Sequence, residues 1–295
     1  RQSLLAFVVA GGGFAGVETV AALNDFAREA LRFYPNLSEP MLRVVLVHPG
    51  AVILPELGES LGRYAQQVLA QRGVEIRLNT RVTSMTENEV CLKDNPPIPA
   101  TTLIWTAGTT SNPLLASLPC QKEGGRVVVN ESLQIPDWTG VWAVGDSAFV
   151  PDAGQSGKSH PPTAQHAIRE GRVVAQNIAR VLAGRPPMPF SFKTIGLLAS
   201  IGRRTGVARI LGFNFSGFLA WWLWRTIYLG KLPGFDKKVR VAFDWTLDLL
   251  FRKDVCAVHD LPSRAGFHRR EHLQGMAGDN GQYRRTAEVE ATLSN

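Results

Sequence analysis

Residues 7–18 read FVVAGGGFAGVE, in which an apolar strand pattern runs directly into Gly-x-Gly-x-x-Gly and then into a helical pattern. Gly11 permits the tight turn, Gly13 lets the backbone approach a pyrophosphate, and Gly16 allows close packing of a helix on a strand. A helix N-terminus also attracts phosphates through its free N–H groups and its dipole. Because a strand precedes the motif and a helix follows it, the stretch predicts a dinucleotide-binding loop rather than a structural glycine turn.

The segment around and after this loop has an α/β pattern, in which helical spacing of apolar residues alternates with short apolar runs. The predicted helices cover residues 17–31 and 60–72, and the predicted strands cover 43–47, 74–78, 82–86, 89–92 and 103–105. This alternation predicts a largely parallel, doubly wound sheet with an antiparallel insert. We place the first domain at residues 1–102.

The composition of the chain limits the classes of protein to which it can belong. The chain has 295 residues and is 45% hydrophobic, enough to bury a sizeable core in two domains or in one domain with an appendage. Cys91, Cys120 and Cys256 lie far apart without a Cys-x-x-Cys motif, which excludes a disulfide framework, a zinc knuckle and a dithiol centre. We therefore expect no metal site. The formal net charge of +7 suits either a nucleic acid or an anionic membrane surface.

A second region, residues 103–184, is predicted to contain strands at 127–129 and 140–146 and a helix at 164–182. The second strand ends in Gly-Asp. A carboxylate at the C-terminal end of a strand lies where α/β sheets bind ligands, but an Asp that only caps the next turn explains the pattern equally well. The periodicity of the helix predicts an inner face that includes Ile168 and Ile178.

The third region, residues 190–262, begins with a hairpin pattern and continues into a segment crowded with aromatic residues at 213–229. Basic residues and an amphipathic run at 239–251 follow. The aromatic segment is too short and too charged for a membrane span, but tryptophan, tyrosine and flanking lysines are typical of a monotopic anchor. A buried aromatic core or a dimer interface is the alternative.

Two further expectations concern this end of the chain. Nucleic-acid stacking is disfavoured, because the aromatic residues are contiguous rather than interleaved with basic ones, so we expect no nucleic-acid partner. Residues 266–295 are polar and mixed in charge, which predicts a disordered tail.

Four motifs follow one another along the chain. They are the glycine loop with Glu18 after it, GVWAVGD at residues 140–146, PPTAQHA at residues 161–167, and the tryptophan-rich, then basic, C-terminal region. Together they resemble the type II, non-proton-pumping NADH:quinone dehydrogenases, over residues 4–262. In that family one glycine loop binds the ADP half of FAD and a second binds NADH.

The single loop of this chain resembles the second one. The expected fold is therefore an α/β protein with a Rossmann-like NAD(P)-binding domain inserted in an incomplete FAD-binding domain, plus a C-terminal membrane-associating α segment. Because the chain starts at Arg1 with only one loop, we expect an FAD-binding part upstream of it.

The resemblance implies roles for the residues of the first domain. Gly11, Gly13 and Gly16 hold the NADH pyrophosphate, and Glu18 lies near the nicotinamide and flavin rings. Without the resemblance, Glu18 is simply a favourable charge near a helix N-terminus.

The resemblance also implies a flavin site. Gly145 and Asp146 form a turn, and the Asp146 carboxylate accepts a hydrogen bond from a ribityl hydroxyl of the flavin. Gln165 lies beside the isoalloxazine, where quinone approaches. Ala107 and Gly108 form the crossing between the NAD and FAD domains. On residue pattern alone, Gln165 is an ordinary residue of a helical first turn.

Two positions depart from the family pattern. His48 stands where an acidic residue usually binds the adenosine ribose, which leaves the choice between NADH and NADPH open, although NADH is favoured. Arg169 stands where the family often has a second glutamine, which leaves the quinone contacts open.

The expected function is that of a membrane-associated flavoprotein that passes hydride from NADH to FAD and two electrons to quinone. We expect peripheral binding to anionic lipid on the cytoplasmic face of a bacterial plasma membrane or an equivalent one, with a homodimer left open. One alternative is a soluble FAD-dependent NAD(P)H reductase with a protein acceptor, and another is a non-catalytic nucleotide-binding fragment.

Overall fold

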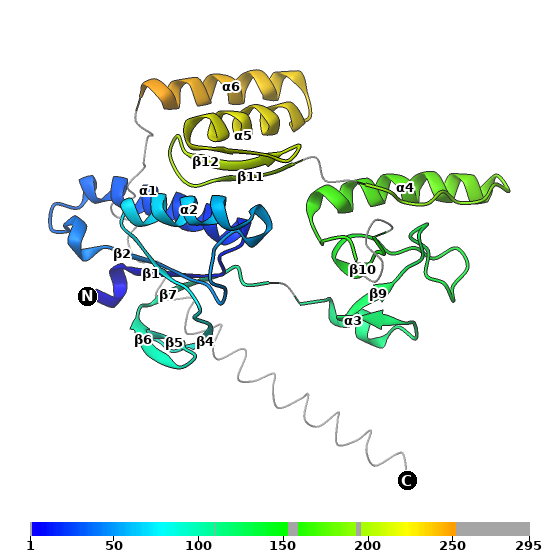
Figure 1. Cartoon of the computed structure of the whole chain (residues 1–295), viewed down its shortest axis with the longest axis horizontal. Coiled ribbons are helices and arrows are strands. Elements are labelled where there is room, and N and C mark those ends of the chain that lie inside the picture. The colour runs from blue at the N-terminus through cyan, green and yellow to red at the C-terminus, as the bar shows by residue number, and fades with distance from the viewer. Residues whose placement is uncertain (1, 109, 153–158, 193–195, 252–295) are drawn as a thin grey trace, which may run out of the picture. The chain divides into compact units, whose positions relative to one another are not determined.

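The computed structural model describes residues 2–108, 110–152, 159–192 and 196–251 (Figure 1). A four-stranded parallel sheet of order β3-β2-β1-β7 organises the N-terminal part. Its strands are β1 (Ala6–Ala10), β2 (Arg43–Val47), β3 (Val74–Arg77) and β7 (Thr102–Trp105). Helix α1 (Phe14–Ala30) connects β1 to β2, and α2 (Glu59–Gln71) precedes β3, which confirms the predicted β-α-β order.

The two faces of this sheet are covered differently. Side chains alternate along each strand, so that Val9 and Leu46 pack against α1 and α2 while Val8 and Val45 pack on the other face. An antiparallel sheet covers that second face, with strands β4 (Val82–Met85), β5 (Glu89–Leu92) and β6 (Asn95–Pro99) (Figure 1). The antiparallel insert is confirmed, but the prediction of a doubly wound sheet is wrong, because no helix packs in this second cluster of the described residues.

Strand β6 was not predicted. Its sequence, NPPIP, contains three prolines, and proline lacks the N–H group that a central strand needs. The strand is nevertheless possible because it lies at the edge of its sheet, where only one side of the backbone must pair. Its single isoleucine, Ile98, is fully buried and anchors it.

The next region has a core of its own, formed by buried residues such as Val127, Leu133 and Phe190. It contains α3 (Pro113–Ser117), β8 (Lys122–Glu123), β9 (Arg126–Val128), the 3-10 helix η5 (Gly145–Ser147), β10 (Ala148–Phe149) and α4 (Ala164–Leu182). The predicted strand at 140–146 is wrong. The N–H groups of Val141 and Ala143 donate to Trp138 and Leu133 instead of to a neighbouring strand, and so the segment is a loop with a single bridge.

The predicted inner face of α4 is wrong for its two isoleucines, although Val174, which was also assigned to that face, packs against the buried cluster of this region. Ile168 and Ile178 are exposed, whereas His166, Glu170 and Asn177 are buried. These polar side chains can be buried because each has a hydrogen-bond partner; the Asn177 amide, for example, donates to the carbonyls of residues 132 and 188.

The C-terminal part contains the predicted hairpin and two helices. Its elements are β11 (Gly196–Ser200), β12 (Gly206–Ile210), β13 (Phe213–Ser216), α5 (Gly217–Lys231) and α6 (Phe235–Leu250). Strand β13 was not predicted, because its phenylalanines were assigned to the aromatic helix that follows. Ala199, Ile201 and Val207 of the hairpin are buried in the same cluster as residues of α1 and α2.

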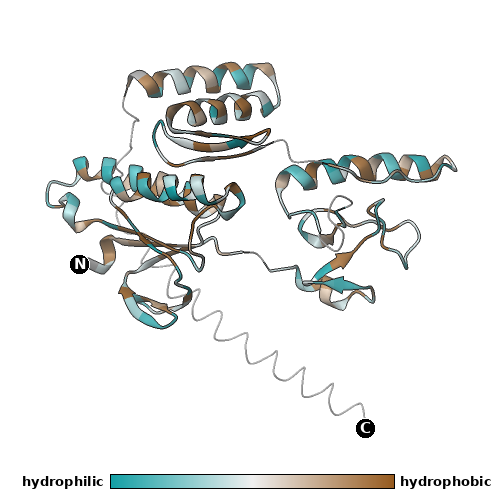
Figure 2. Cartoon of the chain, viewed as in Figure 1, coloured by the Kyte–Doolittle hydropathy of each residue, from teal (hydrophilic) through white to brown (hydrophobic). Residues whose placement is uncertain are grey.

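Figure 2 shows the strands of the central sheet as largely hydrophobic, in contrast to helices such as α1 and α2, where both colours occur. The described residues up to 244 form one compact unit, and residues 245–251 belong to a second. No helix among the described residues is both long and apolar enough to cross a bilayer. The predicted tail, residues 266–295, lies outside the described residues, and the boundaries of the four predicted regions stay predictions.

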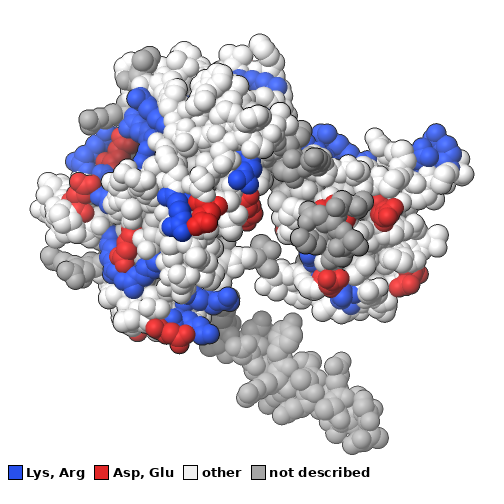
Figure 3. Space-filling view, viewed as in Figure 1, with Lys and Arg blue, Asp and Glu red and all other residues white. Residues whose placement is uncertain are grey.

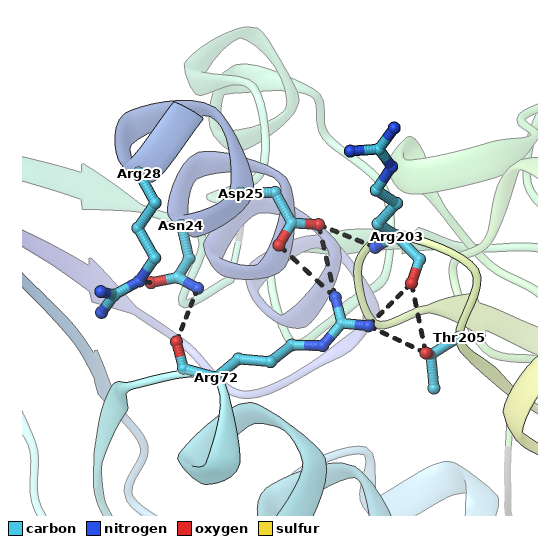
Figure 4. A network of polar contacts seen from close by, with 6 residues as sticks. All are labelled: Asn24, Asp25, Arg28, Arg72, Arg203 and Thr205. Atoms are coloured by element: carbon cyan, nitrogen blue, oxygen red, sulfur yellow. Dashed lines mark hydrogen bonds and ion pairs between the residues drawn. The ribbon is translucent and has the colours of Figure 1, made fainter. Parts of the chain in front are cut away.

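A polar network joins the hairpin turn to α1 and α2 (Figure 4). The Arg72 guanidinium donates to the Arg203 carbonyl at 2.7 Å and to Thr205 Oγ1 at 2.9 Å. It also pairs with the Asp25 carboxylate at 3.4 Å, which in turn accepts from the Arg203 N–H at 2.7 Å. Asn24 also belongs to the network, because its side-chain amide donates to the Arg72 carbonyl.

We predict that Arg72→Met lowers the free energy of unfolding by about 1–3 kcal/mol, because Asp25 and the Arg203 carbonyl each lose the guanidinium as a partner. The matched control is Arg63→Met within α2, the helix that Arg72 follows directly. Its ion pair with Glu59 is 70% and 69% exposed, and its loss is expected to cost at most about 0.5 kcal/mol. Urea denaturation of both variants measures the difference. Equal costs would mean that the network does not stabilise the hairpin.

Candidate nucleotide site

The glycine loop joins β1 to α1 and is shaped by two steric constraints. Gly11 has φ +114°, and its N–H donates to the Val47 carbonyl at 2.9 Å. A Cβ on Gly16 would lie 1.7 Å from the Gly11 carbonyl oxygen. Neither position accepts a side chain without rearrangement of the loop, in agreement with the tight turn and the close helix-on-strand packing that the motif predicts.

Gly13 is different, because a Cβ built on it meets no atom within 4 Å. It precedes the first residue of α1 and has an extended backbone, with φ −76°. The protein itself therefore does not require glycine there, and the space in front of Gly13 is open to a ligand.

The N-terminus of α1 can bind an anion. Its first N–H groups have no acceptor within the helix, as in any α-helix. All residues of α1 are described, and no side chain caps this end and no acidic residue lies in its first turn. A pyrophosphate would supply both the acceptors and the negative charge that the helix end favours.

Thr106 lies against the glycine loop. Its Oγ1 donates to the Ala10 carbonyl at 2.7 Å and lies 2.7 Å from the position that a Cβ on Gly11 would take. The predicted crossing residues Ala107 and Gly108 follow it directly and are exposed, Gly108 with φ +96°. The structure thus brings the end of β7 against the glycine loop.

His48 lies against the same loop. Its Nδ1 accepts from the Gly12 N–H at 3.0 Å. Burial lowers the pKa of His48, while a hydrogen bond with the Val52 backbone and the charge of Glu56 raise it. Because a backbone N–H can only donate, Nδ1 carries no proton and the proton of the neutral ring is on Nε2. The structure gives His48 a contact with the loop, and the predicted contact with the ribose stays a prediction.

Glu18 lies beyond the first turn of α1, partly buried. Its carboxylate accepts from the Ser200 N–H of β11 at 3.0 Å. Burial raises the pKa of Glu18, opposed by that hydrogen bond and by one with the Trp224 side chain. Burial and the charge of Glu18 also raise the pKa of Tyr228. Glu18 therefore links α1 to β11 and α5, and it lies outside the first turn of the helix.

A second cluster forms where η5 meets α4. The N–H of Gly145 donates to the buried Glu170 carboxylate at 2.7 Å. Gly145 has φ +63°, and a Cβ on it would lie 3.2 Å from Ala167. Asp146 is the next residue and is exposed, while Gln165 is half-buried in the first turn of α4. The predicted flavin residues Gly145, Asp146 and Gln165 thus lie on two elements in contact.

Arg169, the departure from the family pattern, folds back on its own helix. It donates to the Gln165 carbonyl at 2.9 Å, and its guanidinium lies 4.0 Å from the Phe192 ring centroid.

Among the described residues, no group of three or more His, Cys, Asp or Glu could hold a metal ion.

The fold and the glycine loop resemble those of the pyridine-nucleotide-dependent oxidoreductases. Residues 1–171 match the model of the pyridine nucleotide-disulphide oxidoreductases, and residues 195–254 match the model of the NDH2 C-terminal domain. The chain belongs to the type II NADH dehydrogenase (NDH2) family within that class. The cofactors of this family are FAD and NADH.

Two relatives illustrate the similarity. A probable NADH dehydrogenase of Dictyostelium discoideum is 32% identical over 259 residues, which cover 86% of this chain and 56% of the relative. The type II NADH:quinone oxidoreductase Ndh of Mycobacterium tuberculosis is 33% identical over 263 residues, with 85% and 55% covered. The chain therefore spans little more than half the length of these relatives.

The NDH2 structure from Plasmodium falciparum in complex with NADH has a TM-score of 0.75 to this chain at 16% identity. It covers 87% of this chain, and 68% of that protein is covered. This likeness shows the fold.

Proposed function

We propose that the complete protein is a membrane-associated NADH:quinone oxidoreductase that passes hydride from NADH to FAD and two electrons to quinone without pumping protons. The balanced reaction is NADH + H⁺ + quinone → NAD⁺ + quinol. The observation that carries the proposal is the glycine loop, which leaves the N-terminus of α1 uncapped and open at Gly13. The names of relatives, including a demethylphylloquinone reductase of Synechocystis, support quinone as the acceptor.

In this proposal the loop binds the pyrophosphate of NADH. Gly11 and Gly16 fix the path of the backbone, and Gly13 gives the phosphates room to approach the N–H groups of α1. No carboxylate stands at the end of β2 to repel a 2′-phosphate, so NADPH is a weaker alternative rather than an excluded one.

The described residues fit the ribityl and isoalloxazine part of FAD. The bond from Gly145 to Glu170 holds the Gly-Asp turn on α4 and leaves the Asp146 carboxylate exposed as an acceptor for a hydroxyl. When bound, FAD supplies the hydride acceptor and the electrons for the quinone. We assign the ADP half of FAD to a part of the complete protein outside this chain, which spans little more than half the length of its relatives, and the crossing between domains to Ala107 and Gly108.

Glu18 and Gln165 are our candidates for the residues nearest the reacting rings. Glu18 follows Gly13 by little more than one turn of α1 and is partly desolvated, and Gln165 opens the helix that holds the flavin turn. Protein groups at such a site orient the rings and exclude water, since the cofactors carry the chemistry.

The C-terminal helices support peripheral binding to a membrane. In α5 only Ala220 and Trp221 are buried, whereas Phe218 and Trp222 are more than half exposed. This exposure argues against an aromatic core helix and leaves a membrane or a dimer partner to cover it. In the part of α6 within residues 1–244, Phe235, Val239 and Phe243 repeat every four residues and are all exposed. These residues lie on one side of the helix.

Basic residues accompany this apolar surface: Lys231, Lys237, Lys238 and Arg240. On the face in view in Figure 3, Lys and Arg are interspersed with Asp and Glu. Interfacial aromatic side chains beside lysines and arginines favour an anionic leaflet over a protein acceptor in solution. We propose the cytoplasmic face of a bacterial plasma membrane or its equivalent.

The catalytic proposal predicts that NADH bleaches the flavin of the complete protein under anaerobic conditions and that added quinone restores the flavin absorbance. Gly13→Ala should require about tenfold more NADH for half-maximal bleaching, because its Cβ occupies the approach of the pyrophosphate, while the protein stays folded with a small loss of thermal stability from alanine at the N-cap. Dithionite, which needs no nucleotide site, should bleach both proteins equally. A complete protein with flavin that NADH does not reduce would refute the proposal.

The membrane proposal predicts that the full chain sediments with vesicles containing phosphatidylglycerol and less with pure phosphatidylcholine. Phe235→Ser with Phe243→Ser should weaken binding at least about tenfold, because two exposed phenylalanines no longer insert. Phe26→Ser is the matched control, since Phe26 is also exposed (57%) but lies on α1. No vesicle binding, together with a concentration-dependent dimer, would favour the dimer interface instead.

A further inference from the structure

The imidazole of His48 fills the space between two glycines. A Cβ on Gly12 would lie 2.6 Å from Cγ of the ring, and a Cβ on Gly50 would lie 2.8 Å from Nε2. The described glycines with positive φ include Gly11 but neither Gly12 nor Gly50. Backbone conformation therefore does not require glycine at these two positions. The ring of His48 excludes a Cβ at Gly50, and at Gly12 the ring does so together with a methyl group of Ile53, 2.9 Å away.

The contacts around His48 fix both the ring and the loop. The His48 N–H donates to the Arg77 carbonyl at 2.8 Å, and its carbonyl accepts from the Thr80 N–H at 3.0 Å. The Gly12 N–H donates to Nδ1 at 3.0 Å, and the Gly12 carbonyl accepts from the Leu54 N–H at 2.8 Å. The side chain thus ties the middle of the glycine loop to the end of β2.

We propose that His48 is a positioning residue that latches the glycine loop in its nucleotide-binding conformation while the ring is neutral, and that protonation of Nδ1 releases the latch. The inference rests on the proposed function, since it concerns the same loop. A protonated Nδ1 can no longer accept a hydrogen bond, and two N–H donors would face each other across 3.0 Å. The loop then loses the contact that orients Gly12 between Gly11 and Gly13.

The charged surroundings of the ring are simple. The glycine loop and residues 49–54 carry no titratable side chain, and Glu56 of the 3-10 helix η4 (Pro55–Leu57) is the charge that raises the pKa of His48. The Arg77 guanidinium on β3 is paired with Glu75 at 2.7 Å. Burial outweighs the opposing contributions and lowers the pKa below the usual 6.5. The latch is therefore complete at neutral pH and is lost as the pH falls below that value.

The test is calorimetric titration of the full chain with ADP-ribose between pH 8 and pH 5, because this ligand carries the pyrophosphate and survives acid, unlike NADH. Wild type should lose about fivefold in affinity over this range, the equivalent of one hydrogen bond. His48→Asn places an amide oxygen near the position of Nδ1 and does not titrate, so its affinity should be independent of pH. His48→Gln, whose amide is one bond farther out, should bind weakly at every pH.

The outcomes separate the latch from the proposed function. Parallel pH profiles in wild type and His48→Asn would overturn the latch, as would a wild-type profile that is flat. Failure of wild type to bind ADP-ribose even at pH 8 would instead contradict the nucleotide site itself. If His48→Asn does not fold, ¹⁵N NMR of the wild-type ring decides: its titration midpoint should coincide with the midpoint of the affinity change, and a mismatch overturns the proposal.

Discussion

The close contact between Gly16 and the Gly11 carbonyl is the constraint on which the rest of the structure depends. With no room for a Cβ at Gly16, α1 lies directly on the end of β1, and its free N–H groups face the open space at Gly13. The same helix carries Glu18 to β11 and, two turns later, Asp25 to the hairpin turn. One steric requirement thus sets both the candidate nucleotide site and the attachment of the C-terminal hairpin.

Elements with a local signal could be predicted from the sequence. The glycine loop, the parallel strands, the antiparallel insert and the β11–β12 hairpin all follow from spacing over a few residues. Predictions failed where tertiary context outweighs pattern. Strand β6 was missed because its sequence contains three prolines. Residues 140–146 form a loop because their N–H groups donate within the loop and not to a neighbouring strand. Helix α4 buries Glu170 and His166 instead of its isoleucines.

In the candidate site, too, the residues of short motifs could be predicted, and the contacts between distant residues could not. Gly11, Gly13, Gly16 and Asp146 belong to short motifs, whereas the contacts that support them connect distant parts of the chain. His48 is 36 residues from Gly12, and Glu18 is 182 residues from Ser200. The periodicity of apolar residues in the sequence does not indicate contacts between residues so far apart. Glu170 lies nearly two turns into α4, and its partner Gly145 is 25 residues away, so no local signal in the sequence indicated this contact either.

The central claim is that NADH binds at the N-terminus of α1, and hydrogen exchange of the chain with and without NADH tests it most directly. The amides of residues 14–16, which no helical carbonyl accepts, should exchange at least about tenfold more slowly with NADH bound, because the pyrophosphate accepts their hydrogen bonds. Unchanged exchange at these amides under saturating NADH, with protection elsewhere in the chain, would contradict the account.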